Sequence, residues 1–326
     1  MKDISLLISA RGHLPTREAL TTQFASITNN GFAGLTQLED EERHKVKGIA
    51  CLFDTIDGQI LDAFPNLEII SSFGVGYDHI DAQAAADRNI VVTHTPGVLD
   101  DEVADTAIGL LLNTIRRLPA AETYLRDGKW ETNGSFPLTP LTLRQRSVGI
   151  YGMGRIGKAI AKRLEGFGVG ISYHNRSQVD GVHYRYCSSL MELAETVDTL
   201  INVVPATPET EKSINASVLK KLGKHGVLIN VGRGSTVSES DLAKALHDGT
   251  IAAAGLDVFA EEPRVPEALM TAPNTVLLPH VASASEHTRM AMGQLVIDNL
   301  VAWFSNREAI TPVPETQHLN RKSSHA

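Results

Sequence analysis

The stretch Ser147-Val148-Gly149-Ile150-Tyr151-Gly152-Met153-Gly154-Arg155-Ile156-Gly157 decides the fold of this chain. An apolar run typical of a buried strand leads directly into a Gly-x-Gly-x-x-Gly turn. An amphipathic helical pattern follows, with Ile160 and Leu164 on its apolar face, and a further strand is expected from Gly170. A glycine-rich turn that joins a strand to a helix inside such a β-α-β unit is the pattern that binds a dinucleotide.

The three glycines of this turn have separate roles in that pattern. Gly152 allows the tight turn, Gly154 lets a pyrophosphate approach the backbone, and Gly157 lets the helix pack closely on the strand. The helix N-terminus then faces the anion, because its first N–H groups have no partner within the helix. We expect the cofactor to be bound by Gly152, Met153, Gly154, Arg155, Ile156 and Gly157. The alternative is a glycine-rich turn without a ligand.

The residues that end the second strand indicate which dinucleotide is preferred. An NAD site usually has a carboxylate about 20 residues after the glycines, where it binds the ribose 2′-hydroxyl. This chain has His174-Asn175-Arg176-Ser177 instead, with no carboxylate. Arg176 offers a guanidinium and Ser177 a hydroxyl to a 2′-phosphate. The sequence therefore predicts that Asn175, Arg176 and Ser177 bind NADPH in preference to NADH. The alternative is that Arg176 is a solvated surface residue and the selectivity is weak.

Apolar runs alternate with helical segments along nearly the whole chain. Several runs are continuous, as in Val227–Val231, which is typical of strands buried on both faces of a parallel sheet. The pattern predicts an α/β fold with doubly wound parallel sheets. The strands are expected at Ile4–Ala10, Gly48–Phe53, Leu67–Phe73, Ile90–His94, Ser147–Tyr151, Gly170–His174, Thr199–Val204, Val227–Val231, Ile251–Val258 and Thr275–Leu278.

Two long helices and two irregular segments complete the expected organisation. The helices are predicted from Asp100 to Arg117, with apolar residues on nearly every face, and from Ser285 to Phe304. Glycine and proline residues between Asp127 and Leu143 predict a loop. The polar segment Thr311–Ala326 is expected to be a frayed tail.

Length and composition restrict the class of protein. A chain of 326 residues is long enough for about two domains, and its net charge of -8 opposes non-specific binding to nucleic acid or anionic membranes. Its two cysteines, Cys51 and Cys187, have no metal-ligand spacing and are expected to be buried thiols in a reducing compartment. The apolar run at the N-terminus is too short for a secretion signal, and no run approaches the ~20 residues of a membrane span. We therefore expect a cytoplasmic protein without a metal.

Four polar residues follow expected strands in the second half of the chain. Arg233 lies between two glycines, and Asp257, Glu262 and His280 follow later strands. Ligands of doubly wound folds bind at the carboxyl ends of the strands. If Glu262 contacts His280, its carboxylate favours the imidazolium and raises the histidine pKa above ~6.5. A protonated histidine beside a carbonyl group is a general acid. Taken singly, each residue has an ordinary structural explanation, but the combination favours catalysis.

The order of these motifs resembles the D-2-hydroxyacid dehydrogenase family, in particular its NADPH-dependent glyoxylate/hydroxypyruvate reductase branch. The resemblance covers roughly residues 45 to 314. It is carried by Phe73–Asp81, Gly152–Gly157, Val204–Thr210, Asn230–Gly234, Gly255–Pro263, Pro279–Ser283, Asn299–Ser305 and Thr311–Val313.

The resemblance implies roles for individual residues. Arg233 is expected to bind the substrate's carboxylate and carbonyl, Glu262 to orient and charge His280, and His280 to donate a proton. Asp257 is expected to hold the nicotinamide carboxamide, and the backbone amides of Val75 and Gly76 the substrate carboxylate. The remaining residues expected to bind the cofactor are Val204, Pro205, Val231, Gly232 and Arg233.

The resemblance also implies a domain organisation and an assembly. Residues 1–98 and 286–326 form a discontinuous substrate-binding domain, and residues 99–285 form a Rossmann cofactor domain, with the active site in the cleft between them. The family is usually dimeric through its cofactor domains, and the loop with Trp130 is expected either to reach a neighbour's active site or to anchor itself.

The expected function is NADPH-dependent reduction of small 2-oxoacids, glyoxylate and hydroxypyruvate, to D-2-hydroxyacids, with NAD as a second cofactor. One alternative is a dehydrogenase for bulkier 2-oxoacids, such as hydroxyphenylpyruvate or 2-ketogluconate. Enzymes of this family that act on formate, phosphite or 3-phosphoglycerate usually favour NAD, and Asn175-Arg176-Ser177 weighs against them. A further alternative is a dinucleotide-sensing corepressor, because the fold alone does not determine function.

Overall fold

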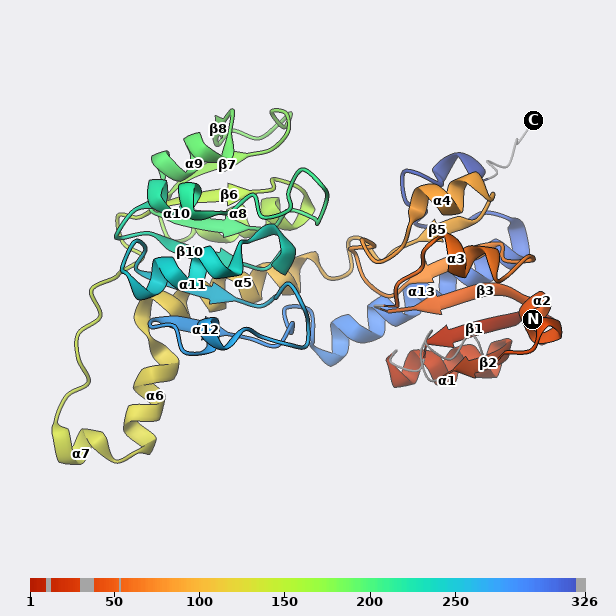
Figure 1. Cartoon of the computed structure of the whole chain (residues 1–326), viewed down its shortest axis with the longest axis horizontal. Helices are drawn as coiled ribbons and strands as arrows, with labels where there is room; N and C mark the ends of the chain where they lie inside the picture. The colour runs from red at the N-terminus through yellow and green to blue at the C-terminus, as the bar shows by residue number, and fades with distance from the viewer. Residues whose placement is uncertain (10–12, 30–37, 53, 321–326) are drawn as a thin grey trace. The chain divides into compact units, whose positions relative to one another are not determined.

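The computed structural model describes residues 1–9, 13–29, 38–52 and 54–320. The chain divides into two compact units. Met1–Leu99 and Ala284–Ala326 together form one, called here the split unit, and Asp100–Ser283 form the other, the continuous unit. In Figure 1 the split unit carries the colours of both chain ends and the continuous unit those of the middle.

The continuous unit, whose residues are all described, contains a parallel sheet of seven strands in the order β12-β11-β10-β9-β6-β7-β8. Counted from β6, this order reads 7-6-5-4-1-2-3, which is the order of a dinucleotide-binding fold with one added edge strand. The strands are β6 (Ser147–Tyr151), β7 (Gly170–His174), β8 (Arg185–Cys187), β9 (Thr199–Asn202), β10 (Val227–Asn230), β11 (Ala253–Leu256) and β12 (Thr275–Leu277).

Helices cover both faces of this sheet. The helices are α5 (Asp100–Arg116), α6 (Leu118–Arg126), α7 (Lys129–Asn133), α8 (Arg155–Glu165), α9 (Leu190–Thr196), α10 (Ala216–Leu222), α11 (Glu239–His247) and α12 (Glu267–Met270). Helices α5 and α8 pack together on one face of the sheet. Helices α9, α10 and α11 lie in a row on the other face, and a hydrophobic cluster is buried between them and the sheet. The fit of α5 is close, because a Cβ at Gly255 of β11 would lie 2.5 Å from the Thr114 hydroxyl.

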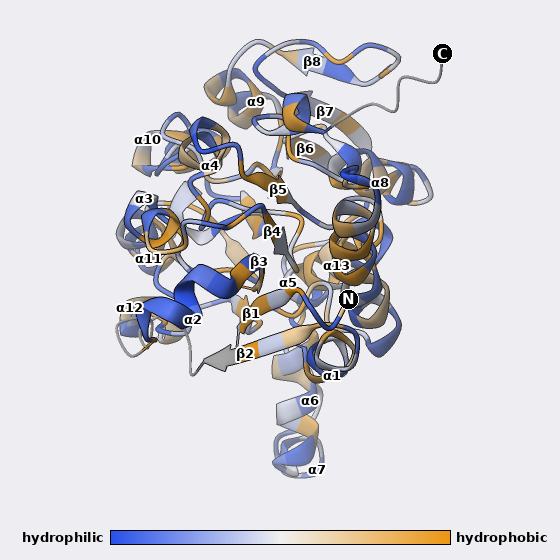
Figure 2. Cartoon of the chain, turned by 90° about the vertical axis from the view of Figure 1, so that its right-hand side faces the viewer, coloured by the Kyte–Doolittle hydropathy of each residue, from blue (hydrophilic) through white to orange (hydrophobic). Residues whose placement is uncertain are grey.

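The split unit has its own parallel sheet, in which the described residues form five strands in the order β2-β1-β3-β4-β5. This order is flavodoxin-like. The strands are β1 (Ser5–Ser9), β2 (Ala25–Asn29), β3 (Val46–Cys51), β4 (Ile69–Ser72) and β5 (Val91–Thr93). The helices are α1 (Leu14–Gln23), α2 (Asp40–Lys45), α3 (Gly58–Asp62), α4 (Ala82–Asp87) and α13 (Glu286–Asn306). Helices α1 and α13 pack together, and α13 lies against β4. Figure 2 shows α2, which buries none of its residues, as mostly hydrophilic.

The fold predicted from the sequence, two α/β units with parallel sheets, is confirmed. Two strands escaped prediction: β2 is short and polar, with the sequence ASITN, and β8 has only three residues. Both are edge strands, so they do not show the apolar run of a strand buried on both faces. Of the predicted strand ends, Ala10 and Phe53 lie outside the described residues.

Two predictions of irregular structure were wrong in part. The segment Asp127–Leu143 contains the helix α7, where Gly128 at φ 70° precedes the first turn. The tail from Thr311 is packed as far as it is described. Its Val313 is fully buried and donates its N–H to the Val92 carbonyl of β5 at 2.9 Å. Polarity misled here, because the tail's short hydroxyl side chains bind backbone groups in place of water.

Candidate active site

The glycine turn between β6 and α8 has the geometry that a bound dinucleotide requires. Gly152 has φ 107°, and a Cβ there would lie 3.0 Å from the backbone of Val203 and Val204. A Cβ at Gly157 would lie 2.1 Å from the Gly152 carbonyl oxygen. In contrast, a Cβ at Gly154 would have no neighbour within 4 Å. Two glycines thus allow the turn to pack, and the middle one leaves space beside the backbone.

The space beside Gly154 lies at the start of α8. Gly154 is the N-cap residue, and no side chain caps the helix. The first N–H groups of an α-helix attract anions, because they lack acceptors within the helix and lie at its positive end. The residues present therefore fit a pyrophosphate group.

The loop after β7 is joined to the glycine turn. The Met153 amide donates a hydrogen bond to the Asn175 side-chain oxygen at 2.6 Å, and the Tyr186 hydroxyl donates to the Asn175 carbonyl at 3.3 Å. Arg176 and Ser177 are exposed. Sequence reasoning missed both connections of Asn175, since nothing in the local pattern links it to Met153 or to a tyrosine on an edge strand.

The charge of Arg176 acts on a third loop of the same sheet edge. The Thr207 hydroxyl, with a smaller contribution from the Arg176 charge, lowers the pKa of Glu209 in the segment after β9. Of the other predicted cofactor residues, Val204 and Gly232 lie together, since a Cβ at Gly232 would be 2.7 Å from the Val204 carbonyl oxygen. Val231 is buried, and the Pro205 carbonyl accepts the Thr210 hydroxyl at 2.7 Å.

A buried polar network holds the backbone of Arg233 after β10. The Arg233 carbonyl accepts the Asn230 side-chain amide at 3.1 Å and the Thr236 hydroxyl at 2.6 Å. Asn202 donates to the Asn230 side-chain oxygen at 2.9 Å and to the Thr236 hydroxyl at 2.7 Å. Sequence analysis did not single out Asn202. The available signal was a single polar residue inside the apolar run from Leu200 to Val204.

Gly234 brings the loops after β10 and β11 into direct contact. A Cβ at this position would lie 1.9 Å from the backbone carbon of Phe259 and 2.3 Å from the Ala260 nitrogen. No side chain fits there, so a glycine is required. The close approach puts Arg233 near enough to Glu262 for its charge to contribute to lowering the carboxyl pKa.

Glu262 and His280 form a close pair, as the sequence analysis considered. The distance from His280 Nδ1 to Glu262 Oε2 is 2.6 Å, and Glu262 Oε1 accepts the Phe259 amide at 3.0 Å. Burial favours the neutral form of Glu262, but the His280 bond, the Phe259 amide and the nearby positive charges outweigh it and lower its pKa. The His280 side chain keeps 28% of its surface exposed, and the Glu262 side chain keeps 31%. Glu262 is therefore a carboxylate held in its charged form, and both side chains of the pair are partly open to solvent.

Asp257 fixes the turn that carries His280. Its carboxylate is buried and accepts the amides of Val281 at 2.8 Å and Ala282 at 2.9 Å, and its carbonyl accepts the His280 amide at 2.8 Å. Burial raises the pKa of Asp257, and the two amides offset this only in part. These bonds hold His280 at φ 54°, in the left-handed region. Contact between Asp257 and a nicotinamide carboxamide stays a prediction.

Val75 and Gly76 lie in the split unit, in the segment after β4. The Thr95 hydroxyl and amide bind the carbonyls of Phe73 and Gly74, each at 3.0 Å, and His94 Nδ1 binds the Val75 carbonyl at 2.8 Å. Within the described ranges, no hydrogen bond uses the amide of Val75 or Gly76. The segment thus presents two adjacent N–H groups, and their orientation is fixed by the contacts of Thr95 and His94 with the neighbouring carbonyls.

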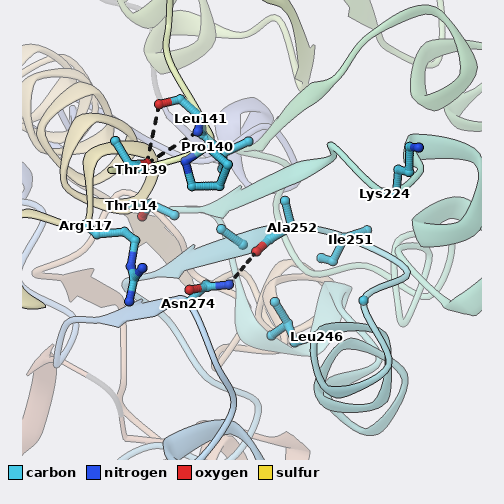
Figure 3. A pocket seen from close by; sticks show the side chains of 12 residues that line it. Thr114, Arg117, Thr139, Pro140, Leu141, Lys224, Leu246, Ile251, Ala252 and Asn274 are labelled. Atoms are coloured by element: carbon cyan, nitrogen blue, oxygen red, sulfur yellow. Dashed lines mark hydrogen bonds between the residues drawn. The ribbon is translucent and has the colours of Figure 1, made fainter. Parts of the chain in front are cut away.

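A pocket of about 200 Å³ lies at the opposite edge of the continuous unit's sheet (Figure 3). It is lined by residues at the amino ends of strands, such as Ala252 and Asn274, and by Thr114 and Arg117 at the end of α5. The residues discussed above follow the carboxyl ends of the strands. This pocket is therefore not part of the candidate active site.

Comparison with known proteins identifies the class. Residues 108–282 match the family described as "D-isomer specific 2-hydroxyacid dehydrogenase, NAD binding domain". Hydroxyphenylpyruvate reductase of Plectranthus scutellarioides is 48% identical over 79% of this chain and 82% of its own. Glyoxylate/hydroxypyruvate reductase A of Arabidopsis thaliana is also 48% identical, with the same coverage of both chains.

A solved structure extends the similarity to the whole chain. The NADPH-dependent glyoxylate/hydroxypyruvate reductase of Sinorhizobium meliloti, in complex with NADP and malonate, is 53% identical. It superposes with a TM-score of 0.94 over 98% of this chain and 99% of its own. The protein belongs to the D-isomer specific 2-hydroxyacid dehydrogenase family, so the family predicted from its motifs is confirmed.

No helix among the described residues is long and apolar enough to cross a membrane.

Proposed function

We propose that this protein reduces small 2-oxoacids, such as glyoxylate and hydroxypyruvate, to D-2-hydroxyacids with NADPH. The observation that carries the proposal is the 2.6 Å contact between His280 and Glu262, with the charge of Arg233 acting on the same carboxylate. A histidine held by a carboxylate beside a fixed guanidinium suits the reduction of a carbonyl group next to a carboxylate.

The proposed roles of the residues combine what the family resemblance implies with the contacts described above. Arg233 binds the substrate's carboxylate and carbonyl oxygen, and the amides of Val75 and Gly76 bind the carboxylate. Glu262 binds His280 Nδ1, so the proton passes to the carbonyl oxygen from Nε2, the other ring nitrogen. When bound, NADPH supplies a hydride to the carbonyl carbon. Asp257 keeps the His280 turn in place. As the family resemblance implies, it also binds the carboxamide of the nicotinamide.

The cofactor preference rests on the loop after β7. Asn175 joins this loop to the glycine turn, and the exposed Arg176 and Ser177 offer a cation and a hydroxyl to a 2′-phosphate. The Sinorhizobium relative was solved with NADP, which supports the same preference here. The remaining predicted contacts are those of Gly152–Gly157, Val204, Pro205, Val231 and Gly232. NAD is a weaker second cofactor.

The test is the initial rate of cofactor oxidation with glyoxylate, hydroxypyruvate and hydroxyphenylpyruvate, each measured with NADPH and with NADH. Fast turnover of the two small acids with NADPH is expected. A kcat/KM ratio of NADPH to NADH at or below one would refute the cofactor preference. Absence of turnover with all three acids, while NADPH still binds, would refute the reductase function.

A second candidate, reduction of bulkier 2-oxoacids, is favoured by the 48% identity to a hydroxyphenylpyruvate reductase. The same assay separates the two candidates. A kcat/KM for hydroxyphenylpyruvate at least tenfold above that for glyoxylate would favour the bulkier substrate.

We assign substrate binding to residues 1–98 and 286–326, and cofactor binding to residues 99–285.

We further propose a homodimer through the cofactor domain. Helices α6 and α7 bury none of their residues and extend away from the rest of the continuous unit (Figure 1). They expose Leu118, Leu125 and Trp130, and Leu138 beyond them is 96% exposed. Exposed apolar residues on one projecting arm are typical of a protein interface. Light scattering on wild type and on a Leu125→Glu, Trp130→Glu variant tests this, with dissociation of the variant expected.

The proposed compartment is the cytoplasm. Cys51 and Cys187 are both buried thiols, which fits a reducing environment.

A further inference from the structure

We propose that His94 is a positioning residue for substrate binding, and that Tyr77 and the C-terminal tail hold it in place. The residues concerned are the substrate loop, 73–78, the end of β5, and the tail from Thr311 to Glu315, all in the split unit. The inference rests on the proposed function, in which the amides of Val75 and Gly76 bind the substrate carboxylate.

The argument begins with the planarity of the peptide bond. In a trans peptide the C=O of one residue and the N–H of the next point in opposite directions. Thr95 N–H binds the Gly74 carbonyl at 3.0 Å and so directs the Val75 N–H. His94 Nδ1 binds the Val75 carbonyl at 2.8 Å and so directs the Gly76 N–H. Two neighbouring contacts therefore aim two neighbouring N–H groups.

These two contacts differ in what a substitution can change. The Thr95 contact uses the backbone and persists with almost any side chain. The His94 contact depends on the imidazole, which must carry a hydrogen on Nδ1 because its partner is a carbonyl oxygen. His94 is thus the side chain through which the orientation of the Gly76 N–H can be changed.

The tail holds the backbone of His94. The His94 amide donates to the Thr311 carbonyl at 3.2 Å, and the Thr311 hydroxyl donates to the His94 carbonyl at 2.6 Å. Pro312 and Thr93 form an antiparallel bridge beside them. Because β5 is an edge strand, the tail can pair with its open side. This pairing fixes the backbone position from which the His94 side chain extends.

Tyr77 restricts the imidazole ring from the other side. Its ring meets that of His94 edge to face, with centroids 5.4 Å apart. Its hydroxyl donates to Glu315 at 3.2 Å, so the tail also holds Tyr77. The substrate loop, His94 and the tail are therefore connected in a closed ring of contacts.

The first experiment compares His94→Ala with His94→Asn. The Asn side-chain nitrogen occupies about the place of Nδ1 and can donate to the Val75 carbonyl, whereas Ala cannot. We expect the KM for glyoxylate to rise about tenfold in His94→Ala and to stay within about threefold of wild type in His94→Asn. The kcat and the KM for NADPH should change less than twofold, because the carboxylate is bound equally in ground and transition states.

A matched pair of tyrosines provides a control. Tyr77 donates to Glu315, and Tyr184 in the continuous unit donates to Glu165 at 2.8 Å, where neither residue belongs to the proposed site. Tyr77→Phe is expected to raise the KM for glyoxylate about threefold, and Tyr184→Phe to leave it unchanged. This pair also keeps the proposal testable if His94→Ala does not fold.

Hydrogen exchange of the Thr95 amide, corrected for its neighbours' intrinsic effects, tests the loop without turnover. Faster exchange is expected in His94→Ala and wild-type exchange in His94→Asn. If the wild type does not reduce 2-oxoacids, the proposed function fails and this measurement alone decides whether His94 holds the loop. The inference is overturned if His94→Ala leaves both the KM and the exchange rate unchanged, or if His94→Asn behaves like His94→Ala.

Discussion

The two edges of the continuous unit's sheet use charged residues in opposite ways. At the amino edge, Arg146 is buried and binds the Asp198 carboxylate at 2.9 Å, the Thr199 hydroxyl at 2.7 Å, and the carbonyls of Asp198 and His225 at 2.6 Å each. At the carboxyl edge, Glu262 and His280 are paired but partly exposed. A buried cation that binds the protein's own carbonyl, hydroxyl and carboxylate groups stabilises the fold. A pair that solvent can reach remains available for chemistry.

The largest effect is expected for His280→Ala, which removes the proposed general acid. The kcat for glyoxylate should fall about 100- to 10,000-fold while NADPH still binds. Stopped-flow turnover and fluorescence titration of NADPH measure the two effects. His280 is partly exposed, so the denaturation midpoint is expected to stay close to that of wild type. Turnover within tenfold of wild type would contradict the role of His280.

Arg146→Ala should show the opposite result. Arg146 is buried, but Asp198 keeps 34% of its side chain exposed, so the loss is expected to be smaller than the ~3–5 kcal/mol of a fully buried pair, although two carbonyls also lose their donor. Urea denaturation is expected to show this loss of stability, while the folded fraction keeps a kcat near that of wild type. Arg146→Lys is the matched control, and it should recover only part of the stability because an ammonium cannot match the planar fork. A variant as stable as wild type would refute the structural role of Arg146.

Arg176 can be compared directly with Arg146, because it is an arginine at the carboxyl edge of the same sheet. Arg176→Ala is expected to lower the NADPH-to-NADH ratio of kcat/KM about tenfold, through loss of a charge-assisted contact to the 2′-phosphate. Unfolding free energy should be unchanged, since the side chain is exposed. Exposed Arg185, at the amino end of the edge strand β8, provides a control in the variant Arg185→Ala. An unchanged cofactor ratio would show that Arg176 does not read the phosphate.

The smallest effect concerns the pH dependence of stability. The pKa of Glu262 is lowered in the folded protein, so its contribution to stability is present above the unfolded value of ~4.3 and disappears as pH falls through the folded value. The difference in unfolding free energy between wild type and Glu262→Gln should shrink as the pH falls below about 4. Denaturation curves across this range measure it. A difference that grows on acidification would reverse the assigned direction.

The sequence predicted the local parts of this molecule better than the contacts between distant parts. The glycine turn and the strand ends that carry Arg233, Glu262 and His280 are encoded in short motifs, because each depends on a strand and the few residues after it. The bond from Met153 to Asn175 depends on which two loops meet at the sheet edge, and the bond from Tyr77 to Glu315 spans 238 positions.

The two mistaken predictions have different causes. Glycine and proline residues were taken as a sign of irregular structure around α7, and polarity was taken as that sign in the tail. In the tail, Thr316 is fully buried and uses its hydroxyl on the Val92 amide at 3.1 Å and the Val92 carbonyl at 3.2 Å. A polar side chain is readily buried when backbone groups lie within reach, and a single sequence does not reveal where they lie.

The division of the split unit has a consequence for how the chain folds during synthesis. Strands β1 to β5 leave the ribosome first, but α13, whose Val296 carbonyl accepts the Ser71 hydroxyl of β4 at 3.4 Å, follows only after the whole continuous unit. Until then, the face of the first sheet that α13 covers is open. Domains made in one piece fold as they emerge. The unit whose synthesis starts first is therefore expected to be the last one completed. Until α13 is synthesised, the nascent chain exposes the apolar residues of these strands that α13 later covers.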